Sequence, residues 1–147
     1  MSINSVPKIF FVALLASSFF RFAFAGDDLM FKTKFNSAVA GVRNGGTATI
    51  RTEAAQHLAE LTGKVDPKSV DDAAIRELIC LLDSNEDSVR MWVAGSLGNL
   101  GPRAKGAVPK LLELLPGADR LRGSLTSAPA IRLALTKIGV NPPAPKP

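Results

Sequence analysis

The sequence Ser96-Leu97-Gly98-Asn99-Leu100-Gly101-Pro102 decides the fold, because versions of it occur three times along the chain. The other two are His57-Leu58-Ala59-Glu60-Leu61-Thr62-Gly63 and Ala134-Leu135-Thr136-Lys137-Ile138-Gly139. Their shared leucines, Leu58, Leu97 and Leu135, lie 39 and 38 residues apart. Self-similarity with a period of about 40 residues is typical of a chain built from stacked supersecondary units.

Each repeat is expected to contain two helices, because apolar residues recur at the i, i+3, i+4, i+7 spacing of one helical face. The first helices carry this spacing at Phe35, Ala38, Val39 and Val42, at Ile75, Leu78, Ile79 and Leu82, and at Val108, Leu111, Leu112 and Leu115. The second helices carry Ile50, Ala54, Leu58 and Leu61; Val89, Val93, Leu97 and Leu100; and Ile131, Leu135 and Ile138. The predicted hairpins are Phe31–Asn44 with Thr49–Thr62, Val70–Leu82 with Ser88–Leu100, and Ala104–Leu115 with Ser127–Ile138.

Polar and small residues mark the ends of these helices. Asp87 or Ser88 is expected to cap the second helix of the middle hairpin. Gly101-Pro102 should end that helix, since glycine adopts the left-handed conformation and proline cannot continue the ladder. Gly63, Gly117 and Gly139 are expected at comparable ends, and 116–126 should form a longer connection in the third hairpin.

Residues 1–25 have the pattern of a cleavable signal peptide. Lys8 supplies a positive charge, residues 9–20 form an apolar run, and Ala23-Phe24-Ala25 is a small-x-small cleavage site. The run is shorter than the about 20 apolar residues that a spanning helix needs, and Arg21 interrupts it. The sequence therefore predicts a secreted or periplasmic protein with no membrane span after cleavage.

Charge divides the rest of the chain into two parts. From Gly26 to Gly101 there are eight Lys/Arg and eleven Asp/Glu, whereas from Pro102 to Pro147 there are eight and two. The only cysteine, Cys80, lies beyond the apolar face of its helix and cannot form an intramolecular disulfide. Stability is therefore expected to come from packing.

The stretch from Asp87-Ser88-Val89-Arg90 through the repeated sequence to Ala107-Val108-Pro109-Lys110-Leu111-Leu112 resembles the HEAT-repeat family. The resemblance implies an all-α fold, a short right-handed α-solenoid of about three HEAT-like helical hairpins. It would occupy residues 26–139, followed by a proline-rich disordered tail, 140–147. Ile50-Arg51 and Val89-Arg90 resemble the family's hydrophobic-Arg pair, from which the third repeat departs, with Ala128 at the equivalent position and Arg132 one turn later.

No catalytic, cofactor-binding or metal-ligating group is expected. His57 is the only histidine, and the chain lacks the His-Glu pairs that the resemblance to HEAT-like metal-dependent hydroxylases would require. Asp83 to Asp87 looks like the start of a calcium loop, but Ser88 replaces the required glycine and Ala94 the closing glutamate. A turn inside a hairpin explains these residues better.

The second helices offer the best candidate surface, because solenoids bind partners along the row that such helices form. Trp and Met away from the core are typical of interfaces. Either Trp92 fills the seam between stacked hairpins or it belongs to a recognition patch. The predicted partner-binding residues are Met91, Trp92, Asn99, Gln56 and Leu133.

Three functions remain open. The first is a non-enzymatic module that binds another protein. The second is binding of a nucleic-acid backbone through the basic C-terminal repeat, although export and the few stacking aromatics (Phe31, Phe35, Trp92) argue against it. The third is an enzyme like the bilin lyases, which share the repeat class. The identity of a protein partner does not follow from the sequence.

The signal-peptide pattern gives a direct prediction. The exported protein should begin at or near Gly26, because the cleavage site ends at Ala25. Intact-mass analysis of the protein in the medium or periplasm checks this, and a soluble cytosolic form retaining Met1 would contradict it.

Overall fold

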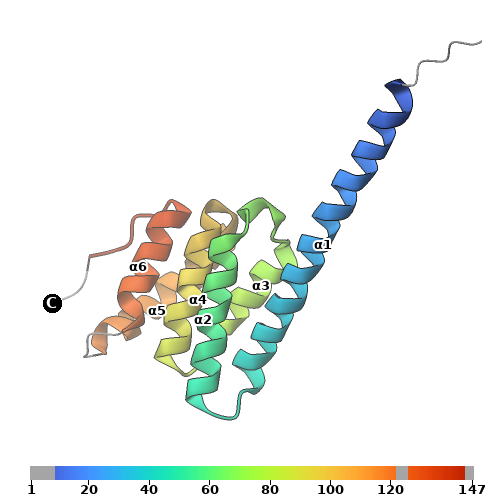
Figure 1. Cartoon of the computed structure of the whole chain (residues 1–147). Helices are drawn as coiled ribbons and strands as arrows, with labels where there is room; N and C mark the ends of the chain where they lie inside the picture. The colour runs from blue at the N-terminus through green and yellow to red at the C-terminus, as the bar shows by residue number, and fades with distance from the viewer. Residues whose placement is uncertain (1–8, 122–125, 145–147) are drawn as a thin grey trace, which may run out of the picture. The chain divides into compact units, whose positions relative to one another are not determined.

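The computed structural model describes the backbone of residues 9–121 and 126–144, with side chains from Asp27 onward in those ranges. All regular elements in these ranges are helices (Figure 1). The α-helices are α1 (Ile9–Asn44), α2 (Ala48–Lys64), α3 (Asp72–Leu81), α4 (Asp87–Leu100), α5 (Val108–Arg120) and α6 (Ser127–Ile138). Two 3-10 helices, η1 (Pro67–Ser69) and η2 (Gly101–Ala107), connect α2 to α3 and α4 to α5.

The chain divides into two compact units, residues 1–34 and 35–147. The first unit carries the beginning of α1, which starts well before the predicted Phe31 and is continuous through residues 25 and 26. Within it, the Thr33 hydroxyl donates to the Leu29 carbonyl over 2.9 Å. Lys8 and the side chains of residues 9–26 lie outside the described part of the structure, so signal cleavage stays a prediction.

The second unit consists of two layers of helices. We call α2, α4 and α6 the inner layer; they lie side by side, with α4 packed between the other two (Figure 1). The end of α1 together with α3 and α5 covers the other side: Gly41 of α1 lies against Ala54, α3 packs on α4, and α5 packs on α6. The hairpins follow in the order that the repeats predict.

The apolar faces of the helix at the end of α1, of α4 and of α6 were predicted correctly. Every predicted core position of these three helices is buried. Leu97, the repeated leucine of the middle hairpin, is fully buried, and so are Leu58 and Leu135. The repeated leucine therefore marks the centre of the core in each hairpin.

Of the predicted core face of α2 only Leu58 is buried, and Ala54 and Leu61 are half-buried. Ile50 is 49% exposed, and Ala55, Leu58 and Thr62 form the buried stripe. Thr62 can lie in the core because its hydroxyl donates to the Leu58 and Ala59 carbonyls over 2.9 and 3.1 Å. The apolar pattern had predicted that Thr62 faces solvent, because it does not take into account that a hydroxyl can bond within its own helix.

Helix α5 also differs from the prediction. It continues through Pro116 and Gly117 to Arg120, so Gly117 does not end a helix, and the connection is shorter than expected. Its buried face is Leu111, Leu115 and Ala118, while Leu112 is 37% exposed. Pro116 lacks an N–H, so the helix loses only the hydrogen bond from residue 116 to the Leu112 carbonyl. Leu112 is exposed, so solvent can reach this part of the helix. Residues 122–125 of the predicted connection lie outside the described part of the chain.

Two glycines end helices as predicted. Gly101 has φ 56° after α4, and Gly139 has φ 102° after α6, backbone conformations that other residues rarely adopt. Beyond Gly139, residues 140–144 are described without regular secondary structure, and Pro143 accepts a hydrogen bond from the Arg132 guanidinium over 3.3 Å. The predicted disordered tail otherwise falls on residues 145–147, outside the described residues.

Leu97 should contribute strongly to stability. Because its side chain is fully buried between hairpins, Leu97→Ala should cost about 2–5 kcal/mol through lost burial and the cavity left behind. Lys68→Ala, at an exposed position of η1, should change stability by less than about 0.5 kcal/mol. Denaturant titrations compare the two, and equal midpoints would contradict this packing.

Candidate functional site

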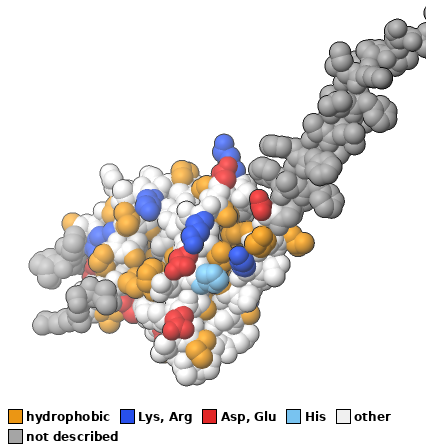
Figure 2. Space-filling view, viewed as in Figure 1, with side chains coloured by type: hydrophobic (Ala, Val, Ile, Leu, Met, Phe, Trp, Pro, Cys, Tyr) orange, Lys and Arg blue, Asp and Glu red, His pale blue; other side chains and the backbone are white. Residues whose placement is uncertain are grey.

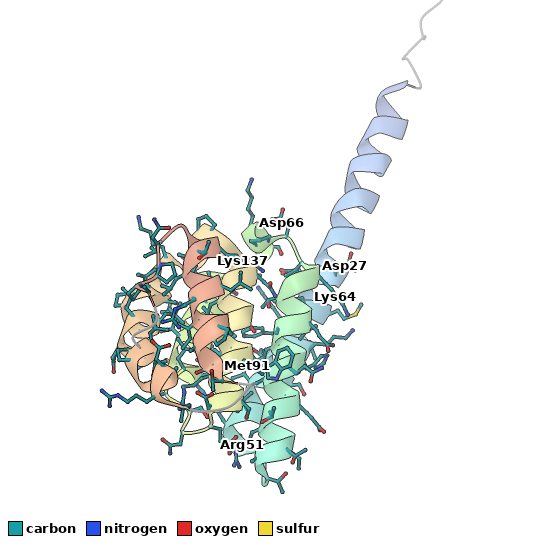
Figure 3. The ribbon with its side chains drawn as sticks, turned by 90° about the vertical axis from the view of Figure 1, so that its left-hand side faces the viewer. Asp27, Arg51, Lys64, Asp66, Met91 and Lys137 are labelled. Carbon is teal, nitrogen blue, oxygen red and sulfur yellow. The ribbon has the colours of Figure 1, made fainter. Side chains whose placement is uncertain are left out.

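Polar bridges join the three inner helices at their N-terminal ends. The Arg51 guanidinium of α2 pairs with the carboxylate of Glu86, the residue that precedes α4. The hydroxyls of Thr52 and Ser88 lie 2.8 Å apart. Figure 3 shows Arg51 at one end of the layer and Lys137 toward the other end, with Met91 between them.

Two of the arginines singled out by the sequence occupy equivalent positions. Arg51 donates to the Gly45 carbonyl, six residues earlier, and Arg90 donates to the Ser84 carbonyl, also six residues earlier. Each therefore ties the start of its helix to the turn before it. Arg132 instead makes a two-pronged contact with Asp119 of α5, at 2.7 and 2.8 Å, which reflects the different register noted for the third repeat.

Asp87 joins α4 to α6. Its carboxylate accepts hydrogen bonds from the Ser127 amide over 2.7 Å and the Ser127 hydroxyl over 2.5 Å. Asp87 or Ser88 was predicted to cap α4, and this was wrong: Glu86 holds the N-cap position without a side-chain bond. Asp87 instead accepts from an N–H in the first turn of α6. Burial favours the neutral carboxyl, but the bonds from Ser127 and Arg90 outweigh it, so the pKa of Asp87 is lowered.

Asn99 joins the inner helices near their C-terminal ends. Its amide nitrogen donates to the Ala59 carbonyl of α2 over 3.0 Å, and its oxygen accepts from the Lys137 ammonium of α6 over 3.5 Å. Thr62 lies 3.5 Å from the same amide nitrogen. One α4 side chain thus contacts both neighbouring helices.

Between these two sets of bridges the inner layer is hollowed by a groove of about 320 Å³. We call it the α4 groove. It is lined by Ala59 and Glu60 of α2, by Trp92, Gly95, Gly98 and Asn99 of α4, and by Ala130, Leu133, Ala134 and Lys137 of α6. The α4 and α6 residues follow the i, i+3, i+7 spacing of one helical face, so the groove runs along both helices.

The groove exists because its floor is made of small residues. A Cβ on Gly98 would lie 3.1 Å from the Ala134 Cα, which is tighter than an ordinary contact, so glycine there lets α4 and α6 approach more closely. A Cβ on Gly95 would meet nothing within 4 Å, because it would point into the groove. Trp92 and Leu133 flank this floor; Leu133 is 56% exposed although it is apolar.

The structure brings together three of the five predicted partner-binding residues. Trp92, Asn99 and Leu133 line the α4 groove. Met91 is half-buried on α4 outside the lining, and Gln56 is exposed on α2, where its amide donates to Glu60 over 3.1 Å. Sequence reasoning missed the role of Gly95 and Gly98, for which the only signal was two glycines inside a helix.

Trp92 is the main aromatic group of the groove. It is half-buried, and within the described residues its indole N–H makes no hydrogen bond. On the face that Figure 2 views, hydrophobic side chains lie among Lys, Arg, Asp and Glu side chains. Trp92 borders a seam between helices that is open to solvent, and its membership of a recognition patch stays a prediction.

Three of the eight basic residues after Gly101 are paired with carboxylates. Arg103 bonds Asp72 over 2.6 Å, Lys110 bonds Asp83 over 2.7 Å, and Arg132 holds Asp119. These pairs lie on η2, α5 and α6 and therefore do not form one strip along the inner layer.

Two other features noted in the sequence lie away from the α4 groove. Cys80 is exposed and lines a second, more polar groove of about 390 Å³ that includes Arg51 and Glu86. In the described part of the chain no cluster of three or more His, Cys, Asp or Glu is arranged to hold a metal ion. No helix there has the length and apolar character needed to cross a bilayer.

The chain was compared with models of protein families, with curated proteins and with solved structures, and none of them matches it. The resemblance to HEAT repeats thus rests on the residues quoted above.

The bond network of Asp87 predicts a pH effect on stability. Because the pKa of Asp87 is lower in the folded than in the unfolded chain, its contribution is present above the ordinary carboxyl pKa and is lost below about pH 4. Asp87→Asn should therefore melt at a lower temperature than the unchanged protein at pH 6. The difference between the two melting temperatures should narrow as the pH falls below about 4. Thermal melts of both proteins across this range check it; a difference that is constant with pH would contradict it.

Proposed function

We propose that this chain is a non-enzymatic, protein-binding HEAT-like α-solenoid module of an exported protein, and that the α4 groove is its binding surface. The observation that carries the proposal is the exposed apolar groove itself, with Trp92 and Leu133 flanking a floor of small residues. The exposed parts of Trp92 and Leu133 contribute no burial to the fold, whereas tryptophan is among the residues most enriched in binding hot spots.

The cross-links of the inner layer support the solenoid part of the proposal. Equivalent arginines bond equivalent turns in the first two hairpins, and polar bridges join α2 to α4 and α4 to α6 at both ends. A stack of repeats in which each unit contacts its neighbours has this character. The bridges also hold the groove open before a partner arrives, which lowers the entropic cost of binding.

The nucleic-acid alternative has weaker support. Binding a phosphate backbone needs unpaired cations along one surface, but Arg103, Lys110 and Arg132 already have carboxylate partners. The α4 groove contributes one cation, Lys137, and one anion, Glu60. An enzyme of the bilin-lyase type is favoured by the family resemblance alone, which is a poor basis for function.

Filling the groove should abolish binding without harming the fold. Gly95→Leu places a side chain in open space within the groove and replaces glycine in a helix, a change that favours the helix by up to about 1 kcal/mol. We expect the variant to keep its helicity and melting temperature but to capture its protein partner about tenfold less well, equivalent to about 1.4 kcal/mol. Capture from the exported fraction, quantified by mass spectrometry, gives the measurement.

Gly117→Leu is the matched control. Gly117 also lies inside a helix with open space around its Cβ, but on α5, away from the groove. It should capture the partner as the unchanged protein does. Equal loss in both variants, or no loss in Gly95→Leu, would contradict the proposal. A steep decline of binding with salt would instead favour a nucleic-acid backbone.

A further inference from the structure

We propose that the α4 groove binds the proline-rich segment Asn141–Pro147 of a second copy of this chain. The inference rests on the proposed function and names the partner of the same groove. The segment, Asn-Pro-Pro-Ala-Pro-Lys-Pro, has four prolines in seven residues and favours a polyproline II conformation. Segments of this kind bind to aromatic-lined grooves at little entropic cost, since they are already extended.

The hydrogen-bonding groups of the groove match such a segment. Prolines have carbonyl groups but no N–H, so the segment needs donors more than acceptors. The groove offers the indole N–H of Trp92, which bonds no described residue, and the ammonium of Lys137 at its rim. The flat indole of Trp92 and the branched side chain of Leu133 can pack against proline rings, and a Cβ on Gly95 would meet nothing within 4 Å.

The charges also match. Lys146 is the only charged side chain of the segment, and Glu60 stands at the α2 side of the groove. The same complementarity extends over the whole molecule, because the chain is acidic from Gly26 to Gly101 and basic after it. The C-terminal part of one copy is therefore attracted to the first two hairpins of another.

The described part of the segment does not contact the groove of its own chain in this structure. The Arg132 guanidinium donates to the Pro143 carbonyl over 3.3 Å, and Arg132 is not among the residues that line the groove. We therefore assign the occupant to a second copy.

The complex should be weak and depend on concentration, because seven residues are far fewer than the about 20–30 residues that each partner contributes to a standard interface. If each of two copies places its segment in the groove of the other, the two form a closed dimer with twofold symmetry.

Trp92 gives a specific signal for this binding, since the chain has one tryptophan and no tyrosine. We expect a peptide with the sequence of Asn141–Pro147 to change the Trp92 emission of the purified chain saturably. A peptide with every proline replaced by glycine should have no such effect. Replacing Lys146 of the peptide with glutamate should weaken binding about tenfold. The protein variant Gly95→Leu should bind the original peptide at least tenfold more weakly than the unchanged chain does. Gly117→Leu should bind it as the unchanged chain does. A response that does not saturate, or one that Gly95→Leu leaves intact, would overturn the proposal.

Sedimentation of the whole chain tests the second copy. Gly95→Leu retains the segment but has a filled groove, whereas Lys146→Glu retains the groove but has an altered segment. Each alone should self-associate less than the unchanged chain, and an equal mixture should form a one-to-one pair. If the chain stays monomeric and the peptide does not bind, while capture of another protein still depends on Gly95, the inference fails and the proposed function stands. If Gly95→Leu alters none of these measurements, both fail.

Discussion

The close approach of α6 to α4 is the contact on which the rest of the inner layer depends. It is possible because residue 98 is glycine: a Cβ there would lie 3.1 Å from the Ala134 Cα and 3.3 Å from its Cβ. The short distance lets Asp87 reach Ser127 at one end of the helices and Asn99 reach Lys137 at the other. A larger side chain at position 98 would push the helices apart and weaken both bridges together.

The same small residues create the α4 groove. Gly95 and Gly98 of α4 face Ala130 and Ala134 of α6, so the surface between the two helices is hollow, and Trp92 stands at its edge. Glycine inside a helix destabilises it by about 1 kcal/mol relative to alanine. At position 95 no packing contact requires glycine, because an added Cβ would meet nothing within 4 Å. The proposed binding surface gives a reason for this glycine, because the proposal places a partner in the empty space.

The sequence predicted the hairpins well and the contacts between them less well. The repeated leucines, the apolar face of α4 and the glycine ends of α4 and α6 follow from local spacing and backbone conformation, which a single sequence displays. Thr62 was misplaced because apolar spacing takes no account of a hydroxyl paired within its own helix, and Ile50 lies off the stripe that Ala55, Leu58 and Thr62 form. The partner of Asp87 lies 40 residues away, and the depth at Gly95 depends on how three helices pack. Local patterns show neither the partner of Asp87 nor the depth of the groove at Gly95. They did place Trp92, Asn99 and Leu133 on the surface of the second helices.

The most direct test of the account is the exchange of the Trp92 indole proton with water, followed by NMR. The chain has one tryptophan, so its indole N–H gives one resonance that needs no further assignment. If Trp92 borders an open groove, as described here, this proton should exchange rapidly in the free protein and become protected when the groove is filled. Slow exchange in the free protein would place Trp92 in a closed seam between hairpins and contradict the assignment of the α4 groove as a binding surface.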